Sequence, residues 1–403
     1  MIRMAYAAGS HHAIKDAFLD LAGEEAWLQR LSDISEASRR RSFSARALQQ
    51  RHALELALAR IFGGEAQASL GRPGSAATEA RALDFAREAV ELAATLPPGP
   101  RDRLRHLLAA GLTGQANLIP LFHMLRVASL QRSRGFIVHH AGLIDGTPHD
   151  LLIRREEAEA EIVCGTALAD EGRPLHHSGW CTLVDRVNPD LHTWLSAHPG
   201  RYVLKVTLPD GIQEPEHVAE LHRRITALLS SRKRHDADQA AVLKLDPLLV
   251  AGAQAALPAV LRAQFGPDTH LAIAGDPSGG NILVIAARSG RENGIAAALC
   301  RHATLAASRL SGTRPGILAM FLEDLNRTEW RSLRESLELE GAVRRFLTQP
   351  AARHVVAVSC ATRMEMFGMV PPDATPGGEL RFRHPSHPQG RLSALLPSVE
   401  SCG

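Results

Sequence analysis

The stretch EAEIVCGTALADEGR, residues 159–173, begins as an alternating extended segment and ends in a polar turn. Side chains of a strand point alternately to its two faces, so Glu159, Glu161, Val163 and Gly165 are expected on one face. The last five residues, ADEGR, are small and polar types that turns favour. The stretch therefore predicts a strand that carries two carboxylates at its entrance and leads into a turn.

The segments before this strand predict a helix followed by two further strands. LFHMLRVASLQRSRG, residues 121–135, has apolar residues at helical spacing. FIVHHAGLI, residues 136–144, and DLLIRR, residues 150–155, are short apolar segments separated by the turn DGTPHD, residues 145–150. A helix that feeds consecutive strands is typical of an α+β arrangement with the helix packed on one face of the sheet.

The rest of the chain alternates strands and helices, which predicts an α/β class. The helical periodicity of the first part ends at LPPGPR, residues 96–101. We expect an N-terminal helical region over residues 1–100, one α/β domain over 101–370, and a mobile tail over 371–403 that is rich in Pro, Gly and Arg. The further strands are expected in RYVLKVTLPDG (201–211), THLAIAGDPSGGNILVIAARS (269–289, two strands), GILAMFLED (316–324) and HVVAVSCATRM (354–364).

Composition restricts the class of protein. The 403 residues carry a formal net charge of only +3, so a surface that binds nucleic acid would have to be a local patch. Five widely spaced cysteines without a CxxC pair argue against a disulfide framework and against a structural zinc site. No signal peptide and no bilayer-spanning apolar segment is evident, so we expect a cytoplasmic protein that does not enter a membrane.

The order of helix, strand, turn with an aspartate, and second strand resembles the PD-(D/E)xK, or restriction-endonuclease-like, superfamily in its bacterial branches. The resemblance covers about residues 118–173, and more loosely residues 314–322. It implies a mixed sheet flanked by helices, a nucleic-acid partner that is DNA more readily than RNA, and Mg²⁺ as the cofactor of any catalysis. In such proteins one strand leads to a catalytic aspartate, and the following strand supplies an acid and a lysine separated by one residue.

The motif is degenerate in this chain. Asp150 matches the first acid, because it follows the turn and precedes an apolar segment. If VCG is aligned with the acid-x-lysine triplet, Val163 replaces the acid and Gly165 replaces the lysine. His123 and Met124 lie where some members of the superfamily carry a further glutamate.

Migrated groups offer a partial replacement for the lost motif. Glu161 is about 7 Å along the strand from the vacant acid position and on the same face, so it can share a metal ion with Asp150. Lys205 can stand in for the missing lysine if its strand is a neighbour. The alternative is that Glu159 and Glu161 are solvated residues at a strand entrance.

Several basic residues are candidates for contact with phosphate. Arg173 is one of them, with Asp170 as the group that would hold its side chain. The alternative is that Asp170 and Gly172 serve only the backbone conformation of a turn. The candidates for nucleic-acid binding are Arg154, Arg155, Arg173, His176, Arg232, Lys233 and Arg234.

Three functions remain open at the level of sequence. The first is a nucleic-acid-binding protein with a nuclease-like fold and lost or altered catalysis. The second is an active Mg²⁺-dependent nuclease that uses Asp150, Glu161 and a relocated lysine. The third is a scaffold for protein–protein interaction without affinity for nucleic acid, and the oligomeric state stays open in all three.

Overall fold

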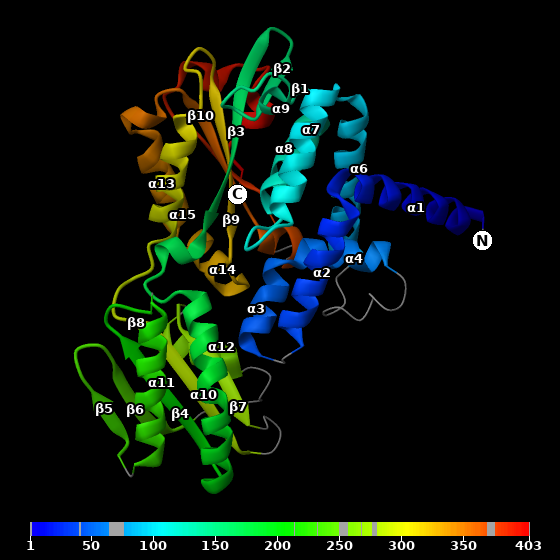
Figure 1. Ribbon diagram of the computed structural model, residues 1–403. Helices are drawn as coiled ribbons and strands as arrows, with labels where there is room; N and C mark the ends of the chain where they lie inside the picture. Colours follow the sequence, from blue (N-terminus) through cyan, green and yellow to red (C-terminus); the bar gives the residue numbers. More distant parts are fainter. Residues whose placement is uncertain are drawn as a thin grey trace. The chain divides into compact units, whose positions relative to one another are not determined.

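The computed structural model describes residues 2–39, 42–63, 76–212, 214–231, 233–249, 257–266, 268–275, 280–368 and 375–402. The chain is of the mixed α/β class and divides into two compact units (Figure 1). Unit 1 contains residues 1–40, 48–168 and 296–403, and unit 2 contains residues 41–47 and 169–295. The second unit is therefore inserted between two segments of the first, a division that differs from the three consecutive regions expected from the sequence.

Unit 1 is built on a mixed six-stranded sheet with the order β1-β2-β3-β9-β10-β11. Strands β1, β2 and β3 form an antiparallel meander, while β9 runs parallel to both β3 and β10. The strands are β1 (Ile137–His139), β2 (Leu151–Arg155), β3 (Ala158–Leu168), β9 (Gly316–Glu323), β10 (Val355–Thr362) and β11 (Leu380–Arg383).

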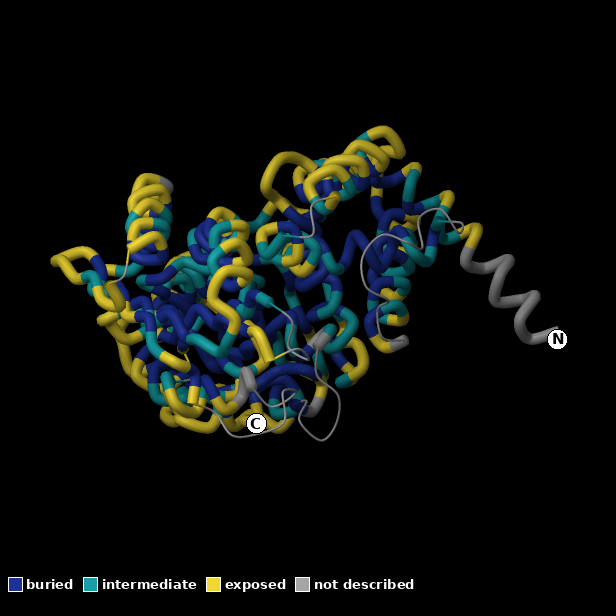
Figure 2. Tube along the Cα trace, turned by 90° about the horizontal axis from the view of Figure 1, so that it is seen from below, coloured by how far each residue is buried: buried dark blue, intermediate teal, exposed yellow. Residues whose placement is uncertain are grey.

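Helices cover both faces of this sheet, and every residue of β9 and of β10 is buried. The α-helices of unit 1 are α1 (Ile2–Ala22), α2 (Glu24–Ser38), α4 (Ala53–Phe62), α6 (Ala76–Thr95), α7 (Pro98–Gly111), α8 (Ile119–Ser133), α9 (Ala141–Ile144), α13 (Ile295–Ala307), α14 (Arg327–Glu335), α15 (Glu338–Leu347) and α16 (Leu396–Val399). Single turns are η3 (Pro350–Ala352), η4 (Met364–Gly368), η5 (Pro376–Gly378) and η6 (Pro388–Arg391). Figure 2 shows the buried residues gathered along the inner elements and the exposed ones on the outer helices.

Three expectations about unit 1 need correction. The N-terminal helices do not form a region of their own, because Phe18 and Phe85 share one hydrophobic cluster with Phe122 of α8 and Phe321 of β9. The expected strand at 136–144 is short: β1 ends at His139 and α9 follows. The expected mobile tail contains β11, which pairs with β10, and α16. Alternating apolar residues such as Leu380 and Phe382 allow this strand to form despite the Pro- and Gly-rich composition around it.

Unit 2 has a five-stranded mixed sheet with the order β5-β6-β4-β8-β7. Helices α10 and α11 pack on one face of it, and Leu261 of α12 packs on part of the other face. Its elements are η1 (Ala169–Gly172), α10 (His177–Ala197), β4 (Arg201–Leu208), α11 (Pro215–Ser230), β5 (His235–Ala237), β6 (Val242–Pro247), α12 (Leu257–Phe265), β7 (His270–Gly275) and β8 (Ile282–Ser289). Helix α3 (Phe43–Arg51) is divided between the two units.

The sequence predicts no apolar segment that could span a membrane. Among the helices of the described residues, none is both long enough and apolar enough to cross a bilayer.

Candidate functional site

Asp150 lies in unit 1, immediately before β2, and both of its carboxylate oxygens accept hydrogen bonds. The backbone N–H of Cys164 on β3 donates to Oδ2 at 2.7 Å. The guanidinium of Arg309 donates from Nη2 to Oδ1 at 2.7 Å. The antiparallel register of β2 and β3, which pairs Leu151 with Ile162, brings Asp150 to this part of β3.

Arg309 follows the end of α13 and connects three parts of the site. Besides Asp150, it donates from Nε to the carbonyl oxygen of Pro148 at 2.8 Å and from Nη1 to that of Cys164 at 3.3 Å. The planar fork of a guanidinium suits such multiple recognition. Arg309 thereby ties the turn before β2 to the middle of β3.

Glu161 of β3 is completely buried and is not the solvated residue that one reading of the sequence expects. Ser311 donates to its carboxylate twice, from the backbone N–H at 2.8 Å and from the hydroxyl at 2.5 Å. Arg314 Nη1 lies 3.6 Å from Oε1, and His149 Nδ1 lies 3.8 Å from Oε2. A buried carboxylate requires such partners to remain stable.

Glu159 lies two residues earlier on β3 and is partly exposed. It accepts hydrogen bonds from Arg154 Nε and from Arg314 Nε, each at 2.7 Å. These bonds, first that of Arg154 and then that of Arg314, hold the pKa of the Glu159 carboxyl below its usual value. Arg154, a candidate for binding phosphate, is therefore engaged within its own hairpin.

We define the carboxylate site as Asp150 and Glu161 together with Arg309, Ser311 and Arg314. The last three lie in the loop between α13 and β9, which contacts both acids. No residue of this loop is among the site residues expected from the sequence. The available signal was two arginines and a serine before a strand that is apolar up to its last residue. From this position polar side chains can turn back onto the neighbouring strand β3.

The two positions at which the superfamily motif requires an acid and a lysine are packed with apolar atoms. Val163 is completely buried. Any Cβ at Gly165 would lie 3.0 Å from Met320 Cε and 3.1 Å from Met320 Sδ. The Met320 side chain on β9 thus fills the space that a lysine at position 165 would need.

His123 is also buried; it lies on helix α8, where some members of the superfamily carry a further glutamate. His123 of α8 is bonded through Nε2 to the carbonyl oxygen of Ala319 at 2.9 Å. Burial lowers the pKa of His123 to about 4, so its imidazole is neutral at physiological pH. It packs against the ring of Phe321, with ring centroids 5.3 Å apart. His123 is a core residue and not a metal ligand.

The carboxylate site does not fit a divalent cation. Mg²⁺ takes oxygen ligands with free lone pairs and keeps several waters. Here all four carboxylate oxygens of Asp150 and Glu161 face donors of the chain. Among the residues that the structure describes, no three His, Cys, Asp or Glu side chains are grouped so that they could hold a metal ion.

Lys205 lies on β4 of unit 2, whose neighbours are β6 and β8. The condition for its recruitment, a strand adjacent to β3, is therefore not met. Its Nζ is 2.9 Å from Asp246 Oδ2 and 5.5 Å from the centroid of the Phe265 ring. Sequence alone could not show that the chain enters a second sheet between Leu168 and Ala296.

The other candidates for binding nucleic acid differ in burial and in their contacts, and they do not lie in one unit. Arg155 of β2 lies over the Phe136 ring at 5.9 Å. Arg173 is only 3% exposed and is bonded to Asp170 at 2.6 Å, so Asp170 holds it as expected but inside unit 2. His176 precedes α10 as its N-cap residue. Lys233 and Arg234 are exposed in unit 2, and Arg232 lies outside the described residues.

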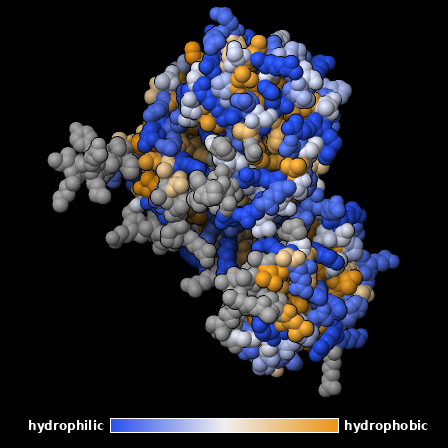
Figure 3. Space-filling view, turned by 180° about the vertical axis from the view of Figure 1, so that it is seen from behind, coloured by the Kyte–Doolittle hydropathy of each residue, from blue (hydrophilic) through white to orange (hydrophobic). Residues whose placement is uncertain are grey.

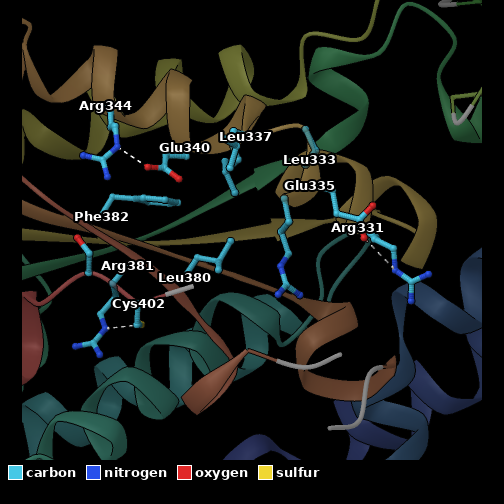
Figure 4. A pocket seen from close by; sticks show the side chains of 13 residues that line it. Arg331, Leu333, Glu335, Leu337, Glu340, Arg344, Leu380, Arg381, Phe382 and Cys402 are labelled. Atoms are coloured by element: carbon cyan, nitrogen blue, oxygen red, sulfur yellow. Dashed lines mark hydrogen bonds and ion pairs between the residues drawn. The ribbon is translucent and has the colours of Figure 1, made fainter. Parts of the chain in front are cut away.

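A separate groove of about 570 Å³ lies in unit 1 between the α14–α15 turn and β11. Leu337, Leu380 and Phe382 lie in it, together with several arginines (Figure 4). Its cations have partners in the fold: Arg344 bonds Glu340 at 2.6 Å, and Arg381 Nε bonds Cys402 Sγ at 3.2 Å. The groove shares no lining residue with the carboxylate site.

Comparisons with known proteins give no relative from which a function could be transferred. No family model, no curated protein and no solved structure matches the chain.

Proposed function

We propose that this protein binds nucleic acid without cleaving it, and that its unit 1 is a fold of the PD-(D/E)xK type whose catalytic site has been lost. One observation carries the absence of cleavage. Residues of the loop 309–314 form hydrogen bonds and ion pairs with Asp150 and Glu161, the two carboxylates that could have held a metal ion.

A guanidinium cannot replace the metal ion of a nuclease. Hydrolysis of a phosphodiester in this superfamily needs a metal ion that lowers the pKa of the attacking water and stabilises the developing charge. Arg309 supplies a fixed positive charge to Asp150, which stabilises the fold, but a guanidinium remains protonated and binds no water as a Lewis acid. The carboxylate site is therefore a structural ion-pair site.

The nucleic-acid partner is supported by the arrangement of elements. Helix α8, the turn that carries Asp150 and strand β3 follow one another in the order that the resemblance implies. DNA is the partner expected first, because the resemblance is to restriction-endonuclease-like proteins.

The test of cleavage uses purified full-length protein with supercoiled plasmid and either Mg²⁺ or Mn²⁺. We expect no nicking above that of the variant Asp150→Asn, which keeps an acceptor for the Cys164 N–H but removes the charge. Cleavage by the wild type that Asp150→Asn abolishes would contradict the proposal and favour a nuclease that uses Asp150 and Glu161.

The test of binding uses gel shifts over a series of salt concentrations. Binding through phosphate contacts weakens steeply as salt rises. Absence of binding even at low salt would contradict the proposal and leave a protein–protein scaffold as the better reading.

A further inference from the structure

The described residues of unit 2 cover one face of its sheet only in part. Leu204, Val206 and Leu208 of β4 point into the cluster beneath α10 and α11. Side chains of a strand alternate, so Val203, Lys205 and Thr207 point to the opposite face. We call the residues of β4, β5, β6, β7 and β8 that point away from α10 and α11 the open sheet face. Figure 3 views the molecule from the side opposite to Figure 1, and unit 2 shows hydrophilic next to hydrophobic side chains there.

Strand register places several basic residues beside one another on this face. Lys205 of β4 is directly opposite Lys244 of β6, and Lys244 is opposite His235 of β5. Arg288 of β8 is opposite Thr207 of β4, and Arg201 begins β4 on the same face. Among the strand residues of this face, all of which the structure describes, the only acid is Asp246.

The two lysines lie toward the part of the face that Leu261 of α12 does not cover. Leu261 of α12 packs with Val203, Ile282 and Val284, which lie toward β8. In contrast, the Lys205 side chain is 36% exposed and that of Lys244 is 54% exposed, toward β5 and β6. Helix α12 ends at Phe265, whose ring lies under Lys205.

Asp246 reduces the repulsion between the two lysines without neutralising the face. Its Oδ2 lies 2.9 Å from Lys205 Nζ and 3.5 Å from Lys244 Nζ. Burial raises the pKa of Asp246, but Lys205 and Lys244 outweigh burial and hold this pKa below its usual value. Four permanent cations, Arg201, Lys205, Lys244 and Arg288, therefore share the face with one carboxylate.

The spread of the cations favours a polyanion over a small anion. From Arg201 to Lys205 is roughly 13 Å along β4, at about 3.3 Å per residue, and neighbouring strands are about 4.8 Å apart. One nucleic-acid strand passes a phosphate about every 3.4 Å in B-form geometry, so several successive phosphates can meet these cations. A single phosphate or carboxylate would reach only one or two of them.

We propose that the open sheet face of unit 2 is the surface that binds the phosphodiester backbone of nucleic acid. This assignment rests on the proposed function and locates its binding site. Lysine and arginine side chains that contact phosphates carry no sequence information, so the binding is tolerant of sequence. Sheet faces also serve as platforms for single strands in known nucleic-acid-binding folds.

The experiment measures the affinity of the full-length protein for fluorescent 20-nucleotide DNA and RNA, single-stranded and duplex, between 50 and 200 mM salt. Four phosphate contacts predict about a 50-fold loss of single-strand affinity over this range, from a slope of about 0.7 per contact. The double variant Lys205→Gln/Lys244→Gln keeps two contacts and should lose only about 7-fold. Its affinity at 50 mM salt should also be lower than that of the wild type.

A matched control removes two positive charges from helices α10 and α11, which pack on the other face of the sheet. Arg186→Gln/Arg223→Gln changes net charge equally and should leave both affinity and salt slope unchanged. Asp246→Asn removes the only acid of the open sheet face and should tighten binding.

The outcomes separate this assignment from the proposed function. Binding that is intact in Lys205→Gln/Lys244→Gln, or weakened equally by the control pair, overturns the assignment and leaves the proposed function standing. Absence of nucleic-acid binding at 50 mM salt overturns both. Binding only to vesicles that contain anionic lipid, with no binding to any oligonucleotide, also overturns both and identifies a different polyanionic surface as the partner.

Discussion

The carboxylate site of unit 1 and the open sheet face of unit 2 are both rich in charge, but they use it in opposite ways. In the carboxylate site the acids Asp150 and Glu161 have partners in the loop that contains Arg309 and Arg314. On the open sheet face the cations outnumber the acids, and Lys244 is mainly exposed. Removing one partner of a charge pair inside a fold is destabilising, whereas surplus charge on an open surface remains available for a partner.

The largest effect that can test this contrast is expected from Glu161→Ala. The change leaves the Ser311 donors and Arg314 without their buried carboxylate, which should cost about 3 kcal/mol of the free energy of unfolding. Chemical denaturation measures the loss, and hydrogen exchange of peptides from β3 and from β4 shows whether it is confined to unit 1.

Glu161→Gln is the control for this prediction. Its amide oxygen still accepts from Ser311, so it should destabilise unit 1 less than Glu161→Ala does. A loss below about 0.5 kcal/mol for Glu161→Ala would show that the buried carboxylate is not structural and would remove the contrast between the two regions.

The second expected effect is a loss of stability at acid pH, because the core of unit 1 contains the neutral side chain of His123. The pKa of His123 is about 4 in the folded protein and about 6.5 in the unfolded chain. The unfolded chain therefore takes up the proton first as pH falls, and stability is lost between pH 6.5 and 4. His123 alone should contribute a loss of about 2 kcal/mol between pH 6.5 and 4.5.

The variant His123→Gln can keep a donor to the Ala319 carbonyl but does not titrate. We expect a smaller loss of stability for it over the same pH range, measured by denaturation at each pH. His106→Gln, at an exposed position of α7, should follow the wild type. Equal acid sensitivity of His123→Gln and the wild type would contradict the role of burial at His123.

The sequence predicted the local elements better than their connections. Helix α8 and strands β2, β3, β4, β9 and β10 lie where periodicity and apolar segments place them. It could not predict that β4 belongs to a different sheet from β3, because local alternation reports the faces of a strand and not its neighbours. The sequence did not predict strand β11, because its alternating pattern is only four residues long and the segment around it is rich in Pro, Gly and Arg.

The candidate site shows the same limit. Asp150 and Glu161 were identified as acids, and β2 and β3 do pair where they lie. Their partners Arg309 and Ser311 are about 150 positions later in the chain, with unit 2 between. The sequence therefore showed which carboxylates are present, and only the fold shows that arginine and serine side chains bind them.

A third effect, smaller than the first two, is expected from Arg309→Gln. The side chain is 40% exposed, so solvent weakens its pair with Asp150. Loss of the bonds to Asp150, Pro148 and Cys164 should cost about 1 kcal/mol of unfolding free energy. Under the proposed function, neither the wild type nor Arg309→Gln should cleave plasmid with Mg²⁺, because Val163 and Gly165 replace the acid and the lysine of the motif. Cleavage by this variant would mean that Arg309 had been blocking a competent metal site.

The smallest effect is expected on the open sheet face itself. Lys244→Gln removes an exposed cation that lies 3.5 Å from Asp246 but also opposite Lys205. The lost ion pair and the relieved repulsion act in opposite directions, so the free energy of unfolding should change by less than about 0.5 kcal/mol. Denaturation of this variant under the conditions used for Glu161→Ala provides the comparison. A loss above about 1 kcal/mol would show that Lys244 holds the sheet together, and the difference between paired charge in unit 1 and available charge in unit 2 would then no longer hold.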